Sequence, residues 1–188
     1  MLWNWEKNRK DIVVGNVIRF NEHTPVDDWI CMSNGTMDVF INVLALSGSA
    51  LAETAEEKQL IVWISEKDQK FGLGTVGFDV VDMPWRRETF SNDKIFILNV
   101  IKAAENKLDW EKLDYIPEYR YLSPNLKRFR EYVEKMTEYD IDENVIAEWL
   151  DAAESDDPVN CGFPRCKKHN TLLTFLGCQI CNSTVNSL

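Results

Sequence analysis

The stretch CKKHNTLLTFLGCQIC, residues 166–181, begins with a CxxH pair and ends with a CxxC pair. Four of the five cysteines and one of the two histidines lie between residue 161 and the C-terminus. Two ligands separated by two residues can face one ion from a single tight turn, and the run TLLTFLG between the pairs can form a hairpin that brings them together. The spacing therefore predicts a tetrahedral metal site.

The predicted ligands form a Cys₃His set that leaves Cys161 outside: Cys166, His169, Cys178 and Cys181. Because protein atoms fill all four positions, such a thiolate-rich set indicates a structural Zn²⁺. A segment this short has too little core to fold alone, so metal binding is expected to supply most of its folding energy. Three alternatives stay open: Cys161 replaces His169, the thiols hold no metal, or the cluster is redox-active.

The chain upstream of this cluster is long enough for one domain of ordinary size. The stretch AESDDPVN, residues 153–160, is rich in acids and contains a proline, which is typical of a linker. We therefore expect a helix-rich acidic globular domain over residues 1–155 and a zinc-knuckle-like segment over residues 156–188.

Apolar residues recur at three- and four-residue steps in most of the first domain, a period typical of amphipathic helices. TAEE at residues 54–57 has the spacing of a capping box. Ser47 and Gly48 place small side chains on one side of the first helix, so another element can pack closely against it. Helices are predicted from Thr36, from Thr54 to about Asp68, from Ser91 to about Asn106, from Asn125 to about Glu138, and, with Asp142 as its cap, from Glu143 to about Ala153. The apolar stripes predicted for the last three helices are Phe96, Ile97, Val100, Ile101 and Ala104; Leu126, Phe129, Tyr132, Val133 and Met136; and Val145, Ile146, Trp149 and Leu150.

Extended structure is expected in three places, where β-branched or glycine-bounded runs interrupt the helical pattern. These places are residues 11–20, residues 29–32, and the glycine-rich loop that enters residues 78–85. The predicted fold class is therefore α+β: a helix-dominated single domain with a small sheet and a C-terminal zinc-binding appendage.

The formal net charge is −10, and residues 160–188 carry three bases and no acid, so the acidic excess lies upstream. An acidic surface repels nucleic acid and anionic lipid and accelerates association with basic proteins. We find neither an apolar run of membrane-spanning length nor a secretory signal, so we expect a cytoplasmic protein and no membrane partner.

The segment that follows the glycine-rich loop holds the most concentrated polar and aromatic patch in the chain: Asp79, Asp82 and Trp85. We interpret this patch first as an interaction surface, and second as a turn that anchors the core. GLGTVG at residues 72–77 follows a helix and precedes a strand, the reverse of the order in dinucleotide-binding sites, so it predicts a plain turn. Cys31, alone in an apolar neighbourhood, is expected to be a small buried residue.

The layout resembles that of small uncharacterised bacterial proteins among which immunity proteins of polymorphic-toxin systems are found. The resemblance lies in the GFDVVDMPW segment, the FILNVIKAAENKLDWEKLDY segment, and the late CxxH and CxxC pairs, and it covers mainly residues 37–181. It implies a protein that binds and neutralises a toxin, often a basic nuclease, of the same cell. No binding residue can be transferred from that group.

The first functional hypothesis is therefore a non-enzymatic protein-binding module of the immunity or antitoxin type, whose acidic surface opposes a basic partner. The second hypothesis is a small hydrolase or transferase with Asp79 and Asp82 in its cleft and His23 as general base. The third is a nucleic-acid-binding zinc module that uses Lys167 and Lys168, which the acidic remainder of the chain disfavours.

Overall fold

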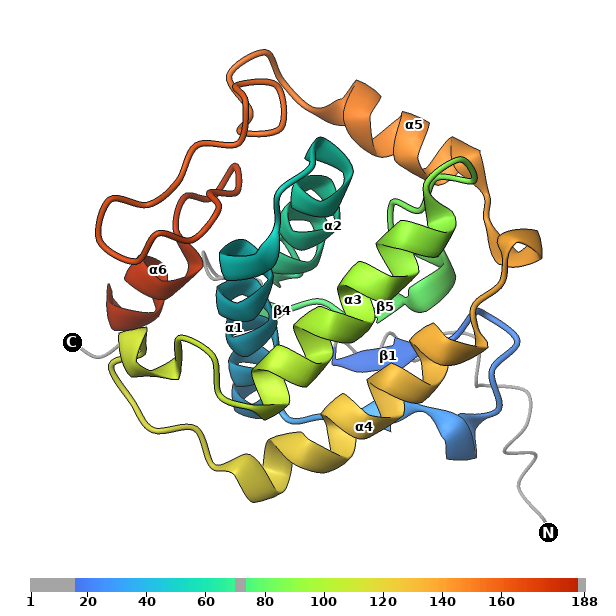
Figure 1. The fold of residues 1–188 in the computed structure, drawn as a ribbon. Helices are drawn as coiled ribbons and strands as arrows, with labels where there is room; N and C mark the ends of the chain where they lie inside the picture. The colour runs from blue at the N-terminus through green and yellow to red at the C-terminus, as the bar shows by residue number, and fades with distance from the viewer. Residues whose placement is uncertain (1–15, 70–73, 186–188) are drawn as a thin grey trace, which may run out of the picture.

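The computed structural model describes residues 16–69 and 74–185, and this part of the chain packs helices around a small sheet (Figure 1). The α-helices are α1 (Asn34–Leu51), α2 (Ala55–Ser65), α3 (Phe90–Glu105), α4 (Tyr119–Lys135), α5 (Glu143–Ala152) and α6 (Gln179–Val185). The strands are β1 (Val17–Arg19), β2 (Ile30–Cys31), β3 (Asp68–Gln69), β4 (Gly74–Thr75) and β5 (Phe78–Asp79). The helix-dominated α+β class with a small sheet is confirmed.

Helix α1 lies at the centre, where it packs against α2, α3 and α4. Its residues from 40 to 49 are all buried. The Ser33 side chain accepts a hydrogen bond from the amide of Thr36, so Ser33 is the cap and the helix begins before the expected Thr36. The predicted close approach is found at Gly48, where an added Cβ would stand 2.2 Å from the side chain of Ile61 in α2.

The capping box of α2 is confirmed. Thr54 accepts from the amide of Glu57, and the Glu57 carboxylate accepts from the amide of Thr54. The predicted stripe of α3 is also buried: Phe96, Ile97, Val100, Ile101 and Ala104. In both helices the signal is local, so the sequence was sufficient to predict it.

Helix α4 begins at Tyr119, earlier than the predicted Asn125. Pro124 lies inside this helix. Its missing N–H removes one backbone hydrogen bond, and its ring crowds the carbonyl one turn earlier, so the disturbance is confined to one turn. The Asn125 side chain donates a hydrogen bond to the carbonyl of Tyr121 at 2.8 Å in the same turn. Leu122, four residues before the predicted stripe, is buried with it and adds the turn that we did not expect.

Helix α5 covers the rest of the domain less completely than its pattern suggested. Asp142 caps it as predicted, by accepting from the amide of Asn144. Of its predicted buried residues only Ile146 is buried, while Trp149 and two others are half-buried. One flank of α5 therefore stays open beside the end of α2.

The main sheet has the order β2-β1-β5, with β1 antiparallel to β2 and parallel to β5. The expected strand over residues 11–20 is confirmed at Val17–Arg19, and residues 11–15 lie outside the described part. Strands β3 and β4 form an antiparallel pair. Of the turn expected at residues 72–77, residues 72 and 73 lie outside the described part, residues 74 and 75 form β4 instead, and residues 76 and 77 connect β4 to β5.

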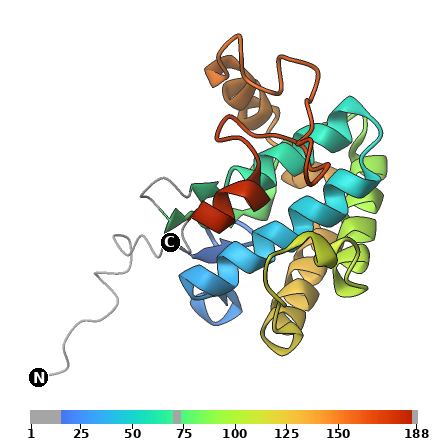
Figure 2. The ribbon, with the colours of Figure 1, turned by 90° about the vertical axis from the view of Figure 1, so that its left-hand side faces the viewer.

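Within residues 16–69 and 74–185, no helix combines the length and the apolar character that crossing a bilayer requires. The C-terminal segment runs over α1 and ends in α6, which contacts that helix (Figure 2). The division into residues 1–155 and 156–188 stays a prediction.

Gly77→Ala is expected to lower the free energy of unfolding by about 1–3 kcal/mol. An added Cβ would stand 2.2 Å from the carbonyl oxygen of Val17 and 2.8 Å from its nitrogen, and these backbone atoms cannot rotate away. Gly35→Ala in the first turn of α1 is the matched control, because nothing lies within 4 Å of its added Cβ. Urea unfolding of both variants measures the difference, and equal losses would refute the packing argument.

Candidate metal centre

Cys166 and His169 lie in a hairpin that is closed by a bridge between Arg165 and Leu172. The amide of Cys166 donates to the carbonyl of Thr171, and the amide of Asn170 donates back to the carbonyl of Cys166, both at 2.8 Å. Asn170 has a φ of 56°, a left-handed conformation that asparagine tolerates well. This turn presents both ligands on one side.

The second ligand pair sits where a tight turn enters α6. Thr174 and Gly177 exchange two backbone hydrogen bonds of 3.0 and 2.8 Å, and Gly177 has a φ of 89° that favours glycine. Cys178 follows this turn directly, and Cys181 lies in the first turn of α6. Because an α-helix turns about 100° per residue, residues three apart face the same side.

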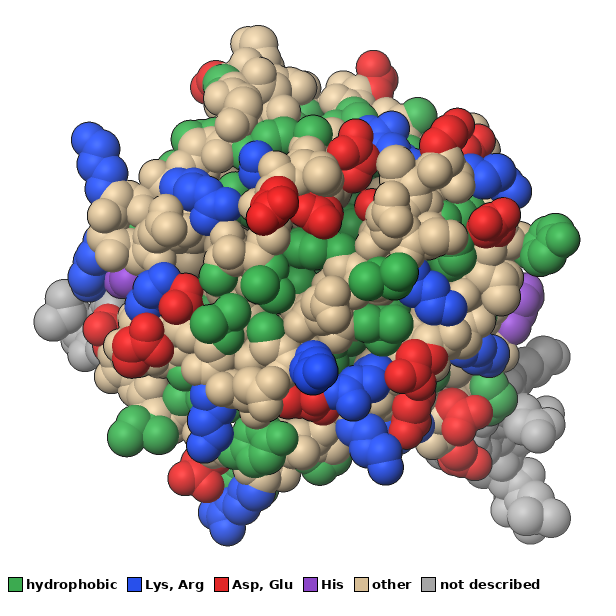
Figure 3. Space-filling view, viewed as in Figure 1, with side chains coloured by type: hydrophobic (Ala, Val, Ile, Leu, Met, Phe, Trp, Pro, Cys, Tyr) green, Lys and Arg blue, Asp and Glu red, His purple; other side chains and the backbone are tan. Residues whose placement is uncertain are grey.

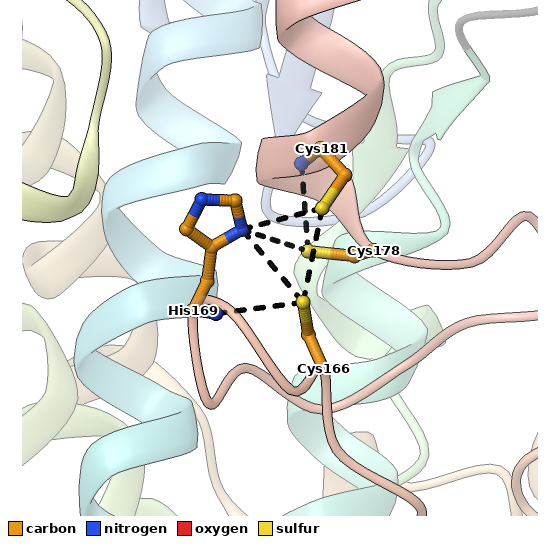
Figure 4. Close-up of side chains that lie close together, drawn as sticks. All are labelled: Cys166, His169, Cys178 and Cys181. Atoms are coloured by element: carbon orange, nitrogen blue, oxygen red, sulfur yellow. Dashed lines mark hydrogen bonds between the residues drawn. The ribbon is translucent and has the colours of Figure 1, made fainter.

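The four predicted side chains converge on one point, and their ligand atoms all lie within 4.8 Å of one another (Figure 4). His169 Nδ1 lies 3.8 Å from Cys166 Sγ, and 3.5 and 3.4 Å from the sulfurs of Cys178 and Cys181. The sulfurs of Cys166 and Cys181 are 3.8 Å apart. These four side chains could therefore hold a metal ion.

The separations fit the edges of a tetrahedron around zinc. With Zn–S near 2.3 Å and Zn–N near 2.0 Å, tetrahedral geometry places two sulfurs about 3.8 Å apart and a sulfur about 3.5 Å from the nitrogen. Four of the six separations, at 3.4–3.8 Å, lie close to these values, and the other two sulfur pairs lie within 4.8 Å. A disulfide needs two sulfurs about 2.05 Å apart, and none of the five cysteines, all within the described residues, forms one.

The polypeptide backbone supports thiolate character at the centre. The amide of His169 donates to Cys166 Sγ at 3.4 Å, and the amide of Cys181 donates to Cys178 Sγ at 3.5 Å. Thr171 Oγ1 lies 3.2 Å from Cys178 Sγ and is buried with it. Hydrogen bonds of this kind spread the negative charge that three sulfurs would carry.

The thiols and the imidazole have different proton affinities. Burial opposes ionisation of Cys166, but the backbone of His169 and Lys168 and the neighbouring thiols lower its pKa below the usual value. Burial, with the hydrogen bonds and charge of Cys166 and Cys178, raises the pKa of Cys181 to about 12.

Burial and the positive charge of Lys168 lower the pKa of His169, so its imidazole is neutral at pH 7 and Nδ1 can act as a ligand. With Nδ1 toward the sulfurs, the hydrogen lies on Nε2, which is buried without a hydrogen-bond partner in the described residues. The thiols must lose their protons to bind a metal, so metal affinity rises with pH.

Arg165 and Leu172 attach the hairpin to the C-terminal end of α1. Arg165 Nη1 donates to the carbonyl of Ser49 at 2.7 Å, and the amide of Leu172 donates to Ser49 Oγ at 2.9 Å. The guanidinium also reaches the carbonyl of Ala52 at 3.5 Å, so it satisfies carbonyls where the helix dipole is negative. Leu172 and Ile180 join the main hydrophobic core. The sequence analysis missed this role of Arg165, whose partners lie more than a hundred residues away.

Cys161 lies outside the cluster, in agreement with the preferred ligand set. Its side chain is exposed, and its thiol donates to the carbonyl of Ser155 at 3.7 Å. Cys31 is also exposed, which corrects the expectation that it is a buried residue. Its strand, β2, turns the side chain of Ile30 into the core, and the alternation of a strand therefore turns Cys31 outward.

The interaction surface predicted at Asp79, Asp82 and Trp85 requires correction, because Asp79 is only 6% and Trp85 only 1% exposed. Arg19 donates to both carboxylate oxygens of Asp79, at 2.6 and 3.0 Å. The indole of Trp85 donates to the carbonyl of Val80 at 2.8 Å. Only Asp82 is exposed. The segment is the core-anchoring turn that we ranked second, because the buried charge and the buried indole are both paired.

The hypothesis of a small hydrolase or transferase loses its support, because the patch that was to supply its carboxylates is largely buried. The Asp79 carboxylate is engaged by Arg19, and the His23 side chain is 84% exposed and lies 3.5 Å from the carboxylate of Glu22. A scan against protein-family models and searches of curated proteins and of solved structures found no match for this chain. The metal centre is therefore the best-defined candidate functional site in the described residues.

We expect one zinc ion per chain in native mass spectrometry of the purified protein, and loss of that ion in Cys178→Ser. The serine oxygen is a poor zinc ligand, and a Cys₂His set leaves one position open. Cys161→Ser is the matched control, because its thiol is exposed and lies outside the cluster. Equal zinc content in both variants, or a metal-free wild type, would contradict the assignment.

Arg165→Gln is expected to lower the free energy of unfolding by about 2 kcal/mol, because it removes charged hydrogen bonds to the end of α1. Lys127→Gln makes the same change of charge at an exposed position of α4 and serves as control. Urea unfolding of the zinc-loaded proteins gives both values. If Arg165→Gln unfolds at the same urea concentration as the control, the anchoring role is wrong.

Proposed function

We propose that the Cys₃His centre holds a structural Zn²⁺. The supporting observation is the convergence of four ligand atoms within 4.8 Å, with four of their six separations at the 3.4–3.8 Å expected of tetrahedral zinc. Four protein ligands leave no position for water or substrate, so the ion stabilises structure and performs no catalysis. Its task is to fix the C-terminal segment against α1.

We infer further that the chain is a non-enzymatic protein-binding module, of the immunity or antitoxin type, that neutralises a basic partner. The net charge of −10 supports a basic partner, because complementary charge raises the association rate. In Figure 3 acidic and basic side chains alternate over the face that is drawn, with apolar groups between them. That face therefore mixes both charges, and recognition needs a local feature besides the overall field.

The test begins with the reading frames that flank the gene, since immunity proteins are encoded beside their toxins. One of them is expected to encode a basic protein that arrests growth, and co-expression of this chain should relieve the arrest. Affinity measured by calorimetry should fall about tenfold or more between about 50 and about 500 mM salt.

Cys178→Ser shows whether the module needs its zinc to protect the cell, and Cys161→Ser is its control. Two results would contradict the proposal: no flanking product whose toxicity this chain relieves, or a partner whose affinity is insensitive to salt. Binding to RNA instead, with a steep salt slope that depends on the exposed Lys167 and Lys168, would replace the proposal by the nucleic-acid-binding alternative.

A further inference from the structure

A cleft of about 710 Å³ opens between the end of α2, the end of α5 with the loop after it, and the hairpin at residues 173–177. Its lining combines acids with apolar groups, and the residues that matter here are Glu66, Trp149, Glu154, Asp157, Leu173 and Phe175. No base lies among the lining residues that the structure describes. The cleft is separate from the metal centre, although the hairpin between the two ligand pairs forms one of its walls.

Glu66 provides the deepest charge in this lining, since the residue is only 8% exposed. Its Oε2 accepts a hydrogen bond from the indole Nε1 of Trp149 at 3.0 Å. Among the described residues its carboxylate has no ion-pair partner. The neighbouring Lys67 packs against the ring of Trp63, with Nζ 3.6 Å from the ring centroid. A buried carboxylate without an ion-pair partner is costly, and a cationic ligand in this cleft would offset that cost.

The walls and the rim suit a cation that is carried on an apolar stem. Phe175 is 56% exposed at the mouth, and Trp149 and Leu173 are half-buried, so apolar surface leads inward to Glu66. Glu154 and Asp156 are exposed at the rim, and Asp157 lies half-buried beside them. Aromatic faces attract ammonium and guanidinium groups, and the stems of lysine and arginine bury well against such surfaces.

We propose that this cleft binds the lysine or arginine side chain of a basic protein partner, with Glu66 as the counter-ion and with Trp149 and Phe175 against its stem. The inference rests on the proposed function, because it identifies where the basic partner inserts a side chain. It supplies the local feature that the net charge alone does not provide.

Titration of Glu66 supports the geometry. Burial raises the pKa of Glu66 to about 7; the charge of Asp157 adds to the rise, and the Trp149 hydrogen bond and Lys67 oppose it. A bound cation stabilises the ionised carboxylate and lowers this pKa again, so protons and the cation compete for the site. Binding is therefore weakest below pH 7 and strengthens as Glu66 loses its proton.

The test uses three capped amino acids as probes: N-acetyl-lysine methylamide, N-acetyl-arginine methylamide, and the neutral N-acetyl-norleucine methylamide. The readout is the indole N–H resonance of Trp149 in the zinc-loaded protein, assigned with Trp149→Phe. We expect saturable shifts with the two cationic probes, stronger at pH 8 than at pH 6, and none with the neutral probe.

Glu66→Gln retains a hydrogen-bond acceptor for Trp149 and should weaken binding about tenfold or more. Glu148→Gln is the matched control, because Glu148 is exposed on α5 and is absent from the lining. Phe175→Ala, at an exposed position, removes the aromatic wall without disturbing the core and should also weaken binding. Unchanged circular dichroism and zinc content establish that each variant is folded.

Absence of saturable shifts, or equal affinity in Glu66→Gln and Glu148→Gln, would overturn the inference. Binding of cadaverine about tenfold or more tighter than the capped lysine would assign the cleft to free amines and would also overturn it. If the probes fail while a basic partner still binds, the cleft assignment is wrong and the proposed function stands. If they bind and no basic partner exists, the cleft stands as a site for basic side chains and the proposed function fails.

Discussion

Three sulfur atoms and one imidazole nitrogen meet beside the C-terminal end of α1, and the path of the last thirty residues depends on that meeting. The two ligand pairs come from separate turns, so a bound ion would fix the hairpin at residues 173–177 between them. Structural zinc contributes about 10–16 kcal/mol in small domains, whereas charged hydrogen bonds such as those of Arg165 contribute about 1.5–3 kcal/mol each. We therefore expect the ion to dominate the stability of this segment, and the contacts to α1 to set its orientation.

Helix α1 links α2 to the metal-binding hairpin, because small residues of α1 allow both of them to pack closely against it. Gly48 allows Ile61 of α2 to approach closely, and Ser49 accepts the amide of Leu172 from the metal-binding hairpin. Larger side chains at these positions would separate α2 and the hairpin from α1. The end of α2 and the hairpin at residues 173–177, which directly follows Leu172, are also two of the walls of the acidic cleft, so the packing around α1 links the metal centre to the proposed binding site.

Features with a short-range signal could be predicted from the sequence, and features made by distant segments could not. The capping box at Thr54 and the Cys₃His cluster each depend on spacings within a few residues, and both are found. The burial of Asp79 could not be predicted, because its partner Arg19 lies sixty residues away and their pairing depends on the register of β1 and β5. The surroundings of Glu66 were missed for the same reason, since three distant segments form its cleft.

X-ray absorption at the zinc edge of the purified protein tests the central claim most directly, because it reports the atoms around the ion. The account predicts a first shell of three sulfur atoms at about 2.3 Å and one nitrogen at about 2.0 Å, with no coordinated water. A shell dominated by oxygen, or one with fewer than three sulfur atoms, would contradict it.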